Sequence, residues 1–214
     1  SLIKPYIFDS ELDLGRGKNY QSIDYSIDDI EEYNSIKQRF LNYDTDISFF
    51  SLSTALQHYY CSQESKIKAV NDLVNNIDDQ VIVFVKYLDS IPLDARKITG
   101  DINSKEREET LSEFKCGAFK TLYITYGCGA FGLNLQNCNN LIFADHTFDY
   151  AERLQAEARI FRLGQENDVT YYDVNCDCGL DRLIRGCLNK KVKLLDEVKR
   201  EIEKKGVEEW LKTI

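Results

Sequence analysis

Four short, largely apolar segments constrain the fold of this chain more than any other feature. They are rich in β-branched and aromatic side chains and lack the polar alternation of a half-exposed strand. The segments are VIVFV (81–85), TLYITY (121–126), LIFA (141–144) and VTYYDV (169–174). Strands of this kind are covered on both faces, as in a parallel sheet, and helix candidates lie between them. The sequence therefore predicts an α/β fold with a parallel sheet, flanking helices and right-handed crossovers.

The first 78 residues have a different sequence pattern, which is typical of helices over most of its length. A helix is predicted at 26–41, where Ser26 and Asp29 have the spacing of a capping box. A second helix is predicted at 65–77. Its apolar face is predicted to consist of Ile67, Val70, Val74 and Ile77. We expect this part to pack against the sheet domain.

Helices are also expected within and after the sheet domain. The segment 104–114 has a candidate N-cap in Ser104, followed by acidic residues. Near the end of the chain, apolar residues recur at helical spacing over a long stretch. The chain is therefore predicted to have three parts. These are a mostly helical accessory segment (1–78), the sheet domain (79–175) and a C-terminal helical extension (176–214).

Charge and composition exclude several classes of protein. The net charge of −9 argues against a simple nucleic-acid-binding module. Residues 1–80 contribute −7 of it and residues 81–214 contribute −2, so phosphate contacts must come from local clusters in the second part. The apolar runs are too short to cross a bilayer, and we expect no membrane partner. Because the chain begins at Ser1 and contains no Met, we expect a piece of a longer protein.

The cysteines predict free thiols rather than a metal site. None of the seven forms a C-x-x-C pair, and only two histidines are present to help. Buried or surface thiols in a reducing compartment are the favoured interpretation.

Two arginines raise the question of function. In a helix, Gln155, Arg159 and Arg162 fall within about 60° of one another. Planar, permanently charged guanidinium groups suit phosphate oxygens. From spacing alone, ion pairs with Glu152 or Glu157 are the favoured alternative, because most surface arginines do nothing more. The apolar positions expected to dock this helix are Tyr150, Leu154, Ala158 and Phe161.

The segment TYGCGAFGLNLQNCNN (125–140) joins two predicted strands and contains Gly127, Gly129 and Gly132. Glycines between a parallel strand and the next element let the backbone approach a ligand closely. Such a turn is a weak signal by itself. Followed by the helix that carries Arg159 and Arg162, it indicates a ligand site shared by the two segments.

Four segments, in this order, resemble a known family. They are VIVFVKYLD (81–89), ITGDINSKEREETLSEFK (98–115), TYGCGAFGLNL (125–135) and QAEARIFRLGQ (155–165). They are similar to motifs of the second RecA-like lobe of superfamily-two helicases, specifically the Swi/Snf family of DNA-dependent motor ATPases. The likeness covers roughly residues 80–175. Phe161 stands where this family usually has His, and Ala158 where Gly is frequent.

The resemblance implies an ATP site in a cleft between two lobes. Arg159 and Arg162 would reach the γ-phosphate, and Gln155 would couple the nucleotide to the glycine-rich segment. ATP and Mg²⁺ would be held mainly by a first lobe, because the P-loop pattern is missing and DLGRGKN (13–19) does not supply it. The residues expected at ATP are Gly129, Gly132, Asn134, Arg159 and Arg162, and those expected at double-stranded DNA are Gly100, Arg107 and Thr125.

Two alternatives remain open. One is a superfamily-two lobe that separates nucleic-acid strands. The ending Leu163-Gly164-Gln165 favours the Swi/Snf type over this alternative. The other is a non-catalytic interaction module of the same fold. The chain alone is expected to be monomeric and inactive as an ATP hydrolase. Its composition hints at a bacterial or phage origin, hence a cytoplasmic location, or a nuclear one in a eukaryote.

Overall fold

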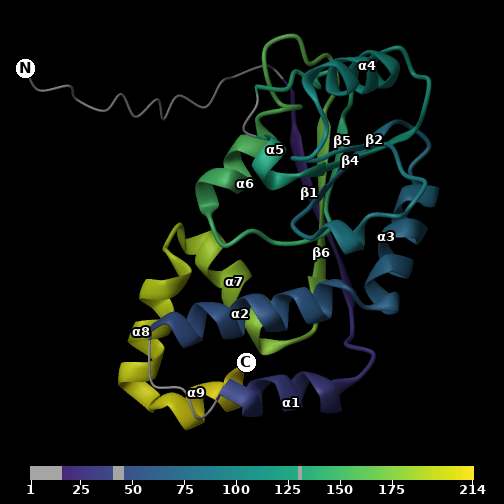
Figure 1. Cartoon of the computed structure of the whole chain (residues 1–214). Helices are drawn as coiled ribbons and strands as arrows, with labels where there is room; N and C mark the ends of the chain where they lie inside the picture. Colours follow the sequence, from purple (N-terminus) through teal and green to yellow (C-terminus); the bar gives the residue numbers. More distant parts are fainter. Residues whose placement is uncertain (1–15, 41–45, 130–131) are drawn as a thin grey trace, which may run out of the picture.

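A computed structural model describes residues 16–40, 46–129 and 132–214 (Figure 1). Its centre is a six-stranded sheet in the order β1-β6-β5-β2-β4-β3, and every neighbouring pair is parallel. The strands are β1 (Lys18–Tyr25), β2 (Val81–Val85), β3 (Lys97–Ile98), β4 (Thr121–Thr125), β5 (Asn140–Phe143) and β6 (Val169–Cys176). The predicted parallel α/β fold is thereby confirmed, and the four apolar segments are β2, β4, β5 and β6.

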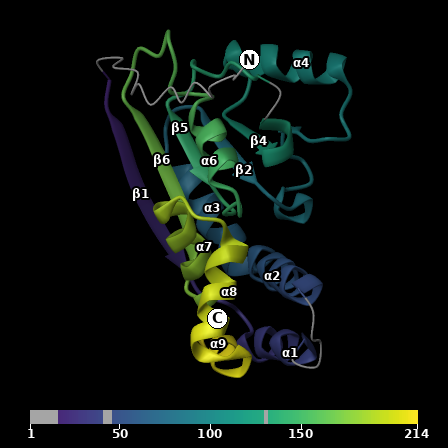
Figure 2. The same ribbon diagram turned by 90° about the vertical axis from the view of Figure 1, so that its left-hand side faces the viewer.

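Helices lie on both faces of this sheet and at one end of it. They are α1 (Ile30–Phe40), α2 (Asp46–Cys61), α3 (Glu64–Asn76), α4 (Ser104–Lys115), α5 (Tyr126–Gly129), α6 (Tyr150–Glu157), α7 (Gly179–Lys190), α8 (Leu194–Lys205) and α9 (Val207–Thr213), with a 3-10 turn at Leu88–Ser90. Figure 2 shows α1, α2, α8 and α9 grouped at the end of the molecule opposite α4. None of the helices in the described part of the chain is long and apolar enough to span a membrane.

Alternate residues of β2 explain why its sequence is apolar throughout. Ile82 and Phe84 belong to a core that also contains residues of α4, α5 and α6. Val81, Val83 and Val85 belong to the core on the other face, with residues of α1, α2, α3 and α7–α9. All five residues are buried. A strand covered on both faces gains from an apolar side chain at every position.

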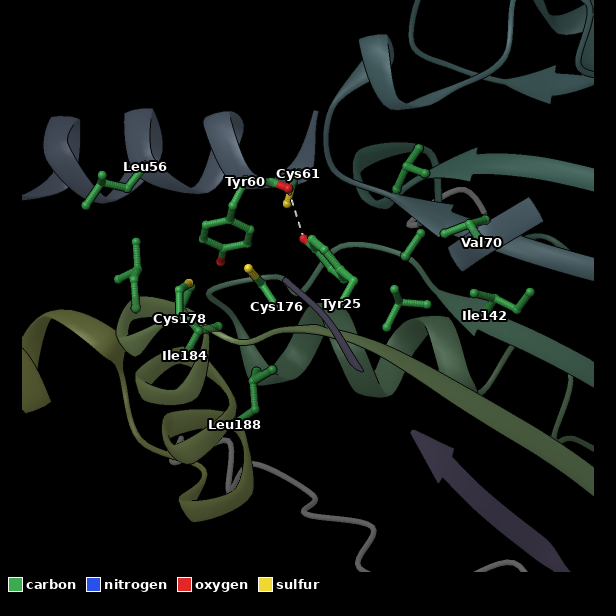
Figure 3. Close-up of a cluster of buried hydrophobic side chains, with 14 of the residues drawn as sticks. Tyr25, Leu56, Tyr60, Cys61, Val70, Ile142, Cys176, Cys178, Ile184 and Leu188 are labelled. Carbon is green, nitrogen blue, oxygen red and sulfur yellow. Dashed lines mark hydrogen bonds between the residues drawn. The ribbon is translucent and has the colours of Figure 1, made fainter. Parts of the chain in front are cut away.

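The core that contains Val81, Val83 and Val85 is rich in cysteine and tyrosine (Figure 3). Cys61, Cys176 and Cys178 are buried beside Tyr25, whose hydroxyl donates to the carbonyl of Tyr60 at 3.0 Å. All seven cysteines of the chain are free, as predicted. Burial raises the pKa of the Cys61 thiol well above its usual value, which keeps it neutral and suited to a core.

Strand β1 was not predicted from the sequence. It lies beside β6 along its whole length, from Lys18 opposite Val169 to Tyr25 opposite Cys176. Its sequence, KNYQSIDY, is polar because most of the strand is exposed at the edge of the sheet. Part of the segment expected to be mostly helical therefore extends the sheet. The proposed division into three parts stays a prediction.

Two helix starts differ from the predicted ones. The carboxylate of Asp29 accepts from the backbone N–H groups of Glu31 and Glu32, both at 3.0 Å, so α1 starts after Asp29 rather than at Ser26. The N-cap of α4 is Asn103, whose side chain accepts from the N–H of Glu106 at 2.9 Å. In both cases a neighbouring Asx side chain caps the helix in place of serine.

The buried face of α3 contains a charge. Lys66 is buried together with Val70 and Leu73, whereas the predicted Ile67 and Val74 are only partly buried. The Lys66 amine forms an ion pair with the buried carboxylate of Asp145, which follows β5. That carboxylate also accepts from the backbone N–H groups at positions 86 and 87, at 2.7 and 3.3 Å. The ion pair thus joins α3 to the ends of β2 and β5.

Candidate functional site

Helix α6 leads into the candidate site. Asp149 caps it by accepting from the N–H of Ala151 at 2.8 Å, and the helix ends at Glu157. Its buried residues are Arg153 and Ala156. The predicted docking stripe is therefore wrong, because Leu154 is exposed. Ala158 is exposed as well, and Tyr150 and Phe161 are only partly buried.

Arg153 replaces an apolar docking residue. Its guanidinium lies 3.3 Å from the centre of the Phe143 ring and pairs with Asp173 on β6 and with Glu157, the latter at 2.8 Å. Burial works against the charged form, but the two carboxylates outweigh it, and the net effect raises the pKa of Arg153. The helix is therefore held to the sheet by a paired, permanently charged side chain.

Both predicted arginines lie beyond the helix, in residues 158–165, which we call the arginine turn. The prediction that they lie on one helical face with Gln155 is wrong, because α6 ends before them. The carbonyl of Glu157 accepts from the N–H groups of Ile160 and Phe161 at 3.3 and 3.2 Å. It also accepts from the Tyr171 hydroxyl at 3.1 Å. Contacts with the sheet thus turn the chain away from the helix axis.

The carboxylates expected to neutralise the arginines have other partners. Glu157 pairs with Arg153, and Glu152 accepts from the hydroxyl of Thr147. Within residues 16–40, 46–129 and 132–214, neither Arg159 nor Arg162 forms an ion pair. The ion-pair alternative is therefore wrong for the described carboxylates.

The guanidinium group of Arg159 has an unsatisfied hydrogen-bond donor. Its Nε is buried and has no hydrogen-bond partner in the described structure. Burial, and secondarily the charge of Arg162, lower the pKa of Arg159. The positive charges of the two neighbouring guanidinium groups are not balanced by described carboxylates, so a bound anion would stabilise them.

The arginine turn is fastened to the segment that precedes β5. The N–H of Leu135 donates to the carbonyl of Arg159 at 3.2 Å. The side-chain amide of Gln165 donates to the carbonyl of Cys138 at 3.0 Å. These contacts place the arginine turn beside the glycine-rich segment, and a ligand site shared by the two stays a prediction. Gly129 ends α5, and Gly132 and Asn134 are exposed just before Leu135, with Gly132 at a φ of 64°. Residues 130–131 lie outside the described part of the chain.

The predicted DNA contacts lie at a different edge of the sheet. Gly100 follows β3 and Thr125 ends β4, and these parallel neighbours pair Ile98 with Ile124. Gly100 and Thr125 therefore sit at the same carboxyl edge. Arg107 is partly buried on α4, which contacts β3. The arginine turn, in contrast, lies where β5 and β6 begin.

Arg159 and Arg162 are both partly buried. A cavity of about 270 Å³ does lie near α6, between that helix, α7 and strands β1 and β6. Its walls include Arg153, Asp173 and His146, but neither Arg159 nor Arg162.

Comparison with known proteins identifies a domain in this chain. The model of the helicase conserved C-terminal domain matches residues 65–164. The uncharacterized ATP-dependent helicase YqhH of Bacillus subtilis is 30% identical over 152 residues, which cover 66% of this chain and 27% of that protein. The TATA-binding protein-associated factor MOT1 of Saccharomyces cerevisiae is 27% identical over 138 residues, or 7% of its length. This chain is a lobe that carries the helicase conserved C-terminal domain.

Solved structures establish the fold of the lobe independently. The crystal structure of the C-terminal part of the Fun30 ATPase domain superposes with a TM-score of 0.67 at 14% identity and covers 88% of the lobe and 98% of that chain. The Sulfolobus solfataricus SWI2/SNF2 ATPase core in complex with dsDNA gives a TM-score of 0.66 at 18% identity over 81% of the lobe and 44% of that chain. The lobe spans about a quarter of the Bacillus relative and under half of the archaeal core.

Some contacts of the lobe were missed from the sequence. The Lys18 amine lies 4.4 Å from the centre of the Phe161 ring, which places a further cation beside the arginine turn. No sequence signal connects these residues, because 143 positions separate them along the chain. Gln165 was noted only as part of a motif ending, and its burial could not be seen from that.

Proposed function

We propose that this lobe supplies Arg159 and Arg162 to the γ-phosphate of ATP in an ATP-dependent double-stranded DNA translocase. The observation that carries the proposal is the pair of neighbouring guanidinium groups whose expected carboxylate partners are occupied elsewhere. Phosphoryl transfer spreads negative charge over the equatorial oxygens, and an arginine aimed at that charge contributes about 10³- to 10⁵-fold in rate. Gln155, on the exposed face of α6, would relay the state of the nucleotide to the glycine-rich segment.

The residue types of the site suit phosphate and do not suit a divalent cation. Guanidinium groups and the backbone around Gly129, Gly132 and Asn134 donate hydrogen bonds to anions, whereas Mg²⁺ needs oxygen ligands. The unpartnered Nε of Arg159 supports this assignment. Mg²⁺, which would neutralise phosphate charge, is therefore assigned to a first RecA-like lobe of the same parent protein, together with most contacts to ATP.

Double-stranded DNA is proposed to lie along the carboxyl edge of β3 and β4. Gly100 is exposed, and no atom lies within 4 Å of the position that a Cβ would take there, so its backbone is open to a phosphate. Thr125 would add a hydroxyl donor and Arg107 a nearby charge. Hinge closure and opening of the two lobes would alternate the grip and move the duplex without a strand-separating wedge.

The experiment is DNA-stimulated ATP hydrolysis by the parent protein carrying Arg162→Ala or Arg159→Ala. Each variant should lower kcat by about 10³-fold or more, with little change in duplex affinity. Arg182→Ala is the matched control, because Arg182 is exposed on α7 and paired with Asp177. Normal turnover by Arg162→Ala would refute the assignment and favour the interaction module. A strand-displacement assay separates the translocase from an unwinding helicase. A monomeric state and a cytoplasmic or nuclear location stay predictions.

A further inference from the structure

Gln165 is the most constrained polar side chain of the arginine turn. It is 7% exposed, and both polar atoms of its side chain have protein partners. Resting on the proposed function, we infer that Gln165 is a positioning residue: its amide holds the arginine turn against the segment before β5 and thereby sets the place of Arg159 and Arg162. It would act on turnover through the arginines and touch neither ATP nor DNA.

The contacts of Gln165 span the turn. Its Nε2 donates to the carbonyl of Ile160, between the two arginines, at 3.2 Å. The same nitrogen donates to the carbonyl of Cys138 at 3.0 Å, which connects the turn to the start of β5. Its Oε1 accepts from the N–H of Asn167 at 3.0 Å, on the way out of the turn. Its own N–H donates to the carbonyl of Arg162 at 3.0 Å.

Only an amide of this length can make all of these contacts. Both Nε2 hydrogens are used on carbonyls, and the Oε1 accepts from an N–H group, so both donors and one acceptor site of the side chain are used. A carboxylate would place a negative charge against two carbonyl oxygens. A thioether would leave those buried carbonyls without a donor. The groups around the side chain of position 165 therefore require Gln rather than another residue of similar size.

Changing Gln165 should disturb the orientation of the two arginines without weakening the binding of ATP or DNA. A misplacement of about 1 Å at a catalytic group can cost about 100-fold in rate. Leu135 still donates to the carbonyl of Arg159 when Gln165 is changed, so the turn stays attached at one point. The expected outcome is a loosened arginine turn on an otherwise folded lobe.

The test uses the parent protein with Gln165→Met, which keeps the length of the side chain and removes both donors. We expect kcat for DNA-stimulated ATP hydrolysis to fall about 10- to 100-fold. The KM for ATP and the duplex affinity should change by less than about 3-fold, because uniform binding is retained. Gln21→Met, on the exposed edge strand β1, is the matched control and should leave kcat unchanged.

A double-mutant cycle with Arg162→Ala separates positioning from general damage. If Gln165 acts through the arginines, Gln165→Met should change kcat by less than about 2-fold once Arg162 is already Ala. Multiplicative losses would overturn the inference. So would normal turnover by Gln165→Met alongside a loss in Arg162→Ala, an outcome that leaves the proposed function standing. Normal turnover by Arg162→Ala instead removes the proposed function itself.

A second variant covers the case in which Gln165→Met does not fold. Gln165→Glu matches the shape, and its carboxyl group can donate one hydrogen bond only when it is protonated. Its kcat relative to the wild type should therefore rise as the pH falls, for example from pH 8 to pH 6. A flat ratio across that range in the folded variant would contradict the inference.

Discussion

The backbone N–H of Leu135 donates a hydrogen bond of 3.2 Å to the carbonyl oxygen of Arg159. This contact joins the glycine-rich segment to the arginine turn, two regions that are separated along the chain by β5 and α6. Gln165 adds a second connection to Cys138. Both segments carry predicted nucleotide contacts, and these two hydrogen bonds fix the position of one segment relative to the other.

The isolated chain should neither hydrolyse ATP nor bind it tightly. Its candidate site offers two partly buried guanidinium groups, and the P-loop pattern that would hold the phosphates is missing from its sequence. Phosphate release and calorimetric titration with ATP and Mg²⁺ are the measurements. Robust turnover by the purified 214-residue chain would contradict the proposed division of labour between two lobes.

Gly164→Ala should damage the arginine turn. Gly164 has a φ of 96°, where a side chain is strained, and an added Cβ would lie 2.5 Å from Nε2 of Gln136. We expect a loss of about 1–3 kcal/mol in the free energy of unfolding, measured with urea, and a lower kcat in the parent protein. The control is Gly186→Ala within α7, where nothing lies within 4 Å and a small gain in stability is expected. Equal effects of the two substitutions would rule out a special role for the turn.

Asp145→Ala should destabilise the fold strongly. It removes the carboxylate that neutralises the buried Lys66, and an unpaired buried charge costs about 3–5 kcal/mol. Asp177→Ala breaks the exposed pair with Arg182 and should cost less than about 1 kcal/mol. Urea denaturation of the two variants side by side provides the measurement. Similar losses would mean that the buried pair contributes no more than a surface pair.

Lys86 should make stability depend on pH. Its amine donates to Oε1 of Gln57 at 2.6 Å and lies 3.2 Å from the centre of the Phe148 ring. Burial lowers the pKa of Lys86 to about 8, against about 10.4 in the unfolded chain. The cost of its buried charge is therefore fully present below pH 8 and is relieved as the pH rises above it.

The comparison with Lys86→Met isolates this effect from other titrating groups. Between pH 7 and pH 9.5, the free energy of unfolding of the wild type should rise by about 2 kcal/mol relative to the variant. Chemical denaturation at several pH values is the measurement. Parallel curves for the two proteins would show that Lys86 titrates normally in the folded state.

The sheet could be predicted because its central strands are buried on both faces. Val81–Val85 is apolar at every position for that reason, and a continuous apolar run is visible without any tertiary information. Strand β1 could not be predicted, because an exposed edge strand needs no apolar pattern. The buried face of α3 was predicted only in part, since Val70 and Ile77 are buried as expected but Lys66 was missed. Lys66 is buried only because Asp145, far along the chain, meets it there.

The sequence by itself determined the α/β class, the family resemblance and the identity of Arg159 and Arg162, since these depend on local composition and on the order of short motifs. Only the tertiary structure decided where α6 ends and which arginine docks the helix. Tyr171 and Gln165 hold the chain beyond Glu157, and Asp173 and Phe143 bury Arg153. Local spacing does not encode these contacts, because their energy comes from groups that meet only after the sheet has formed.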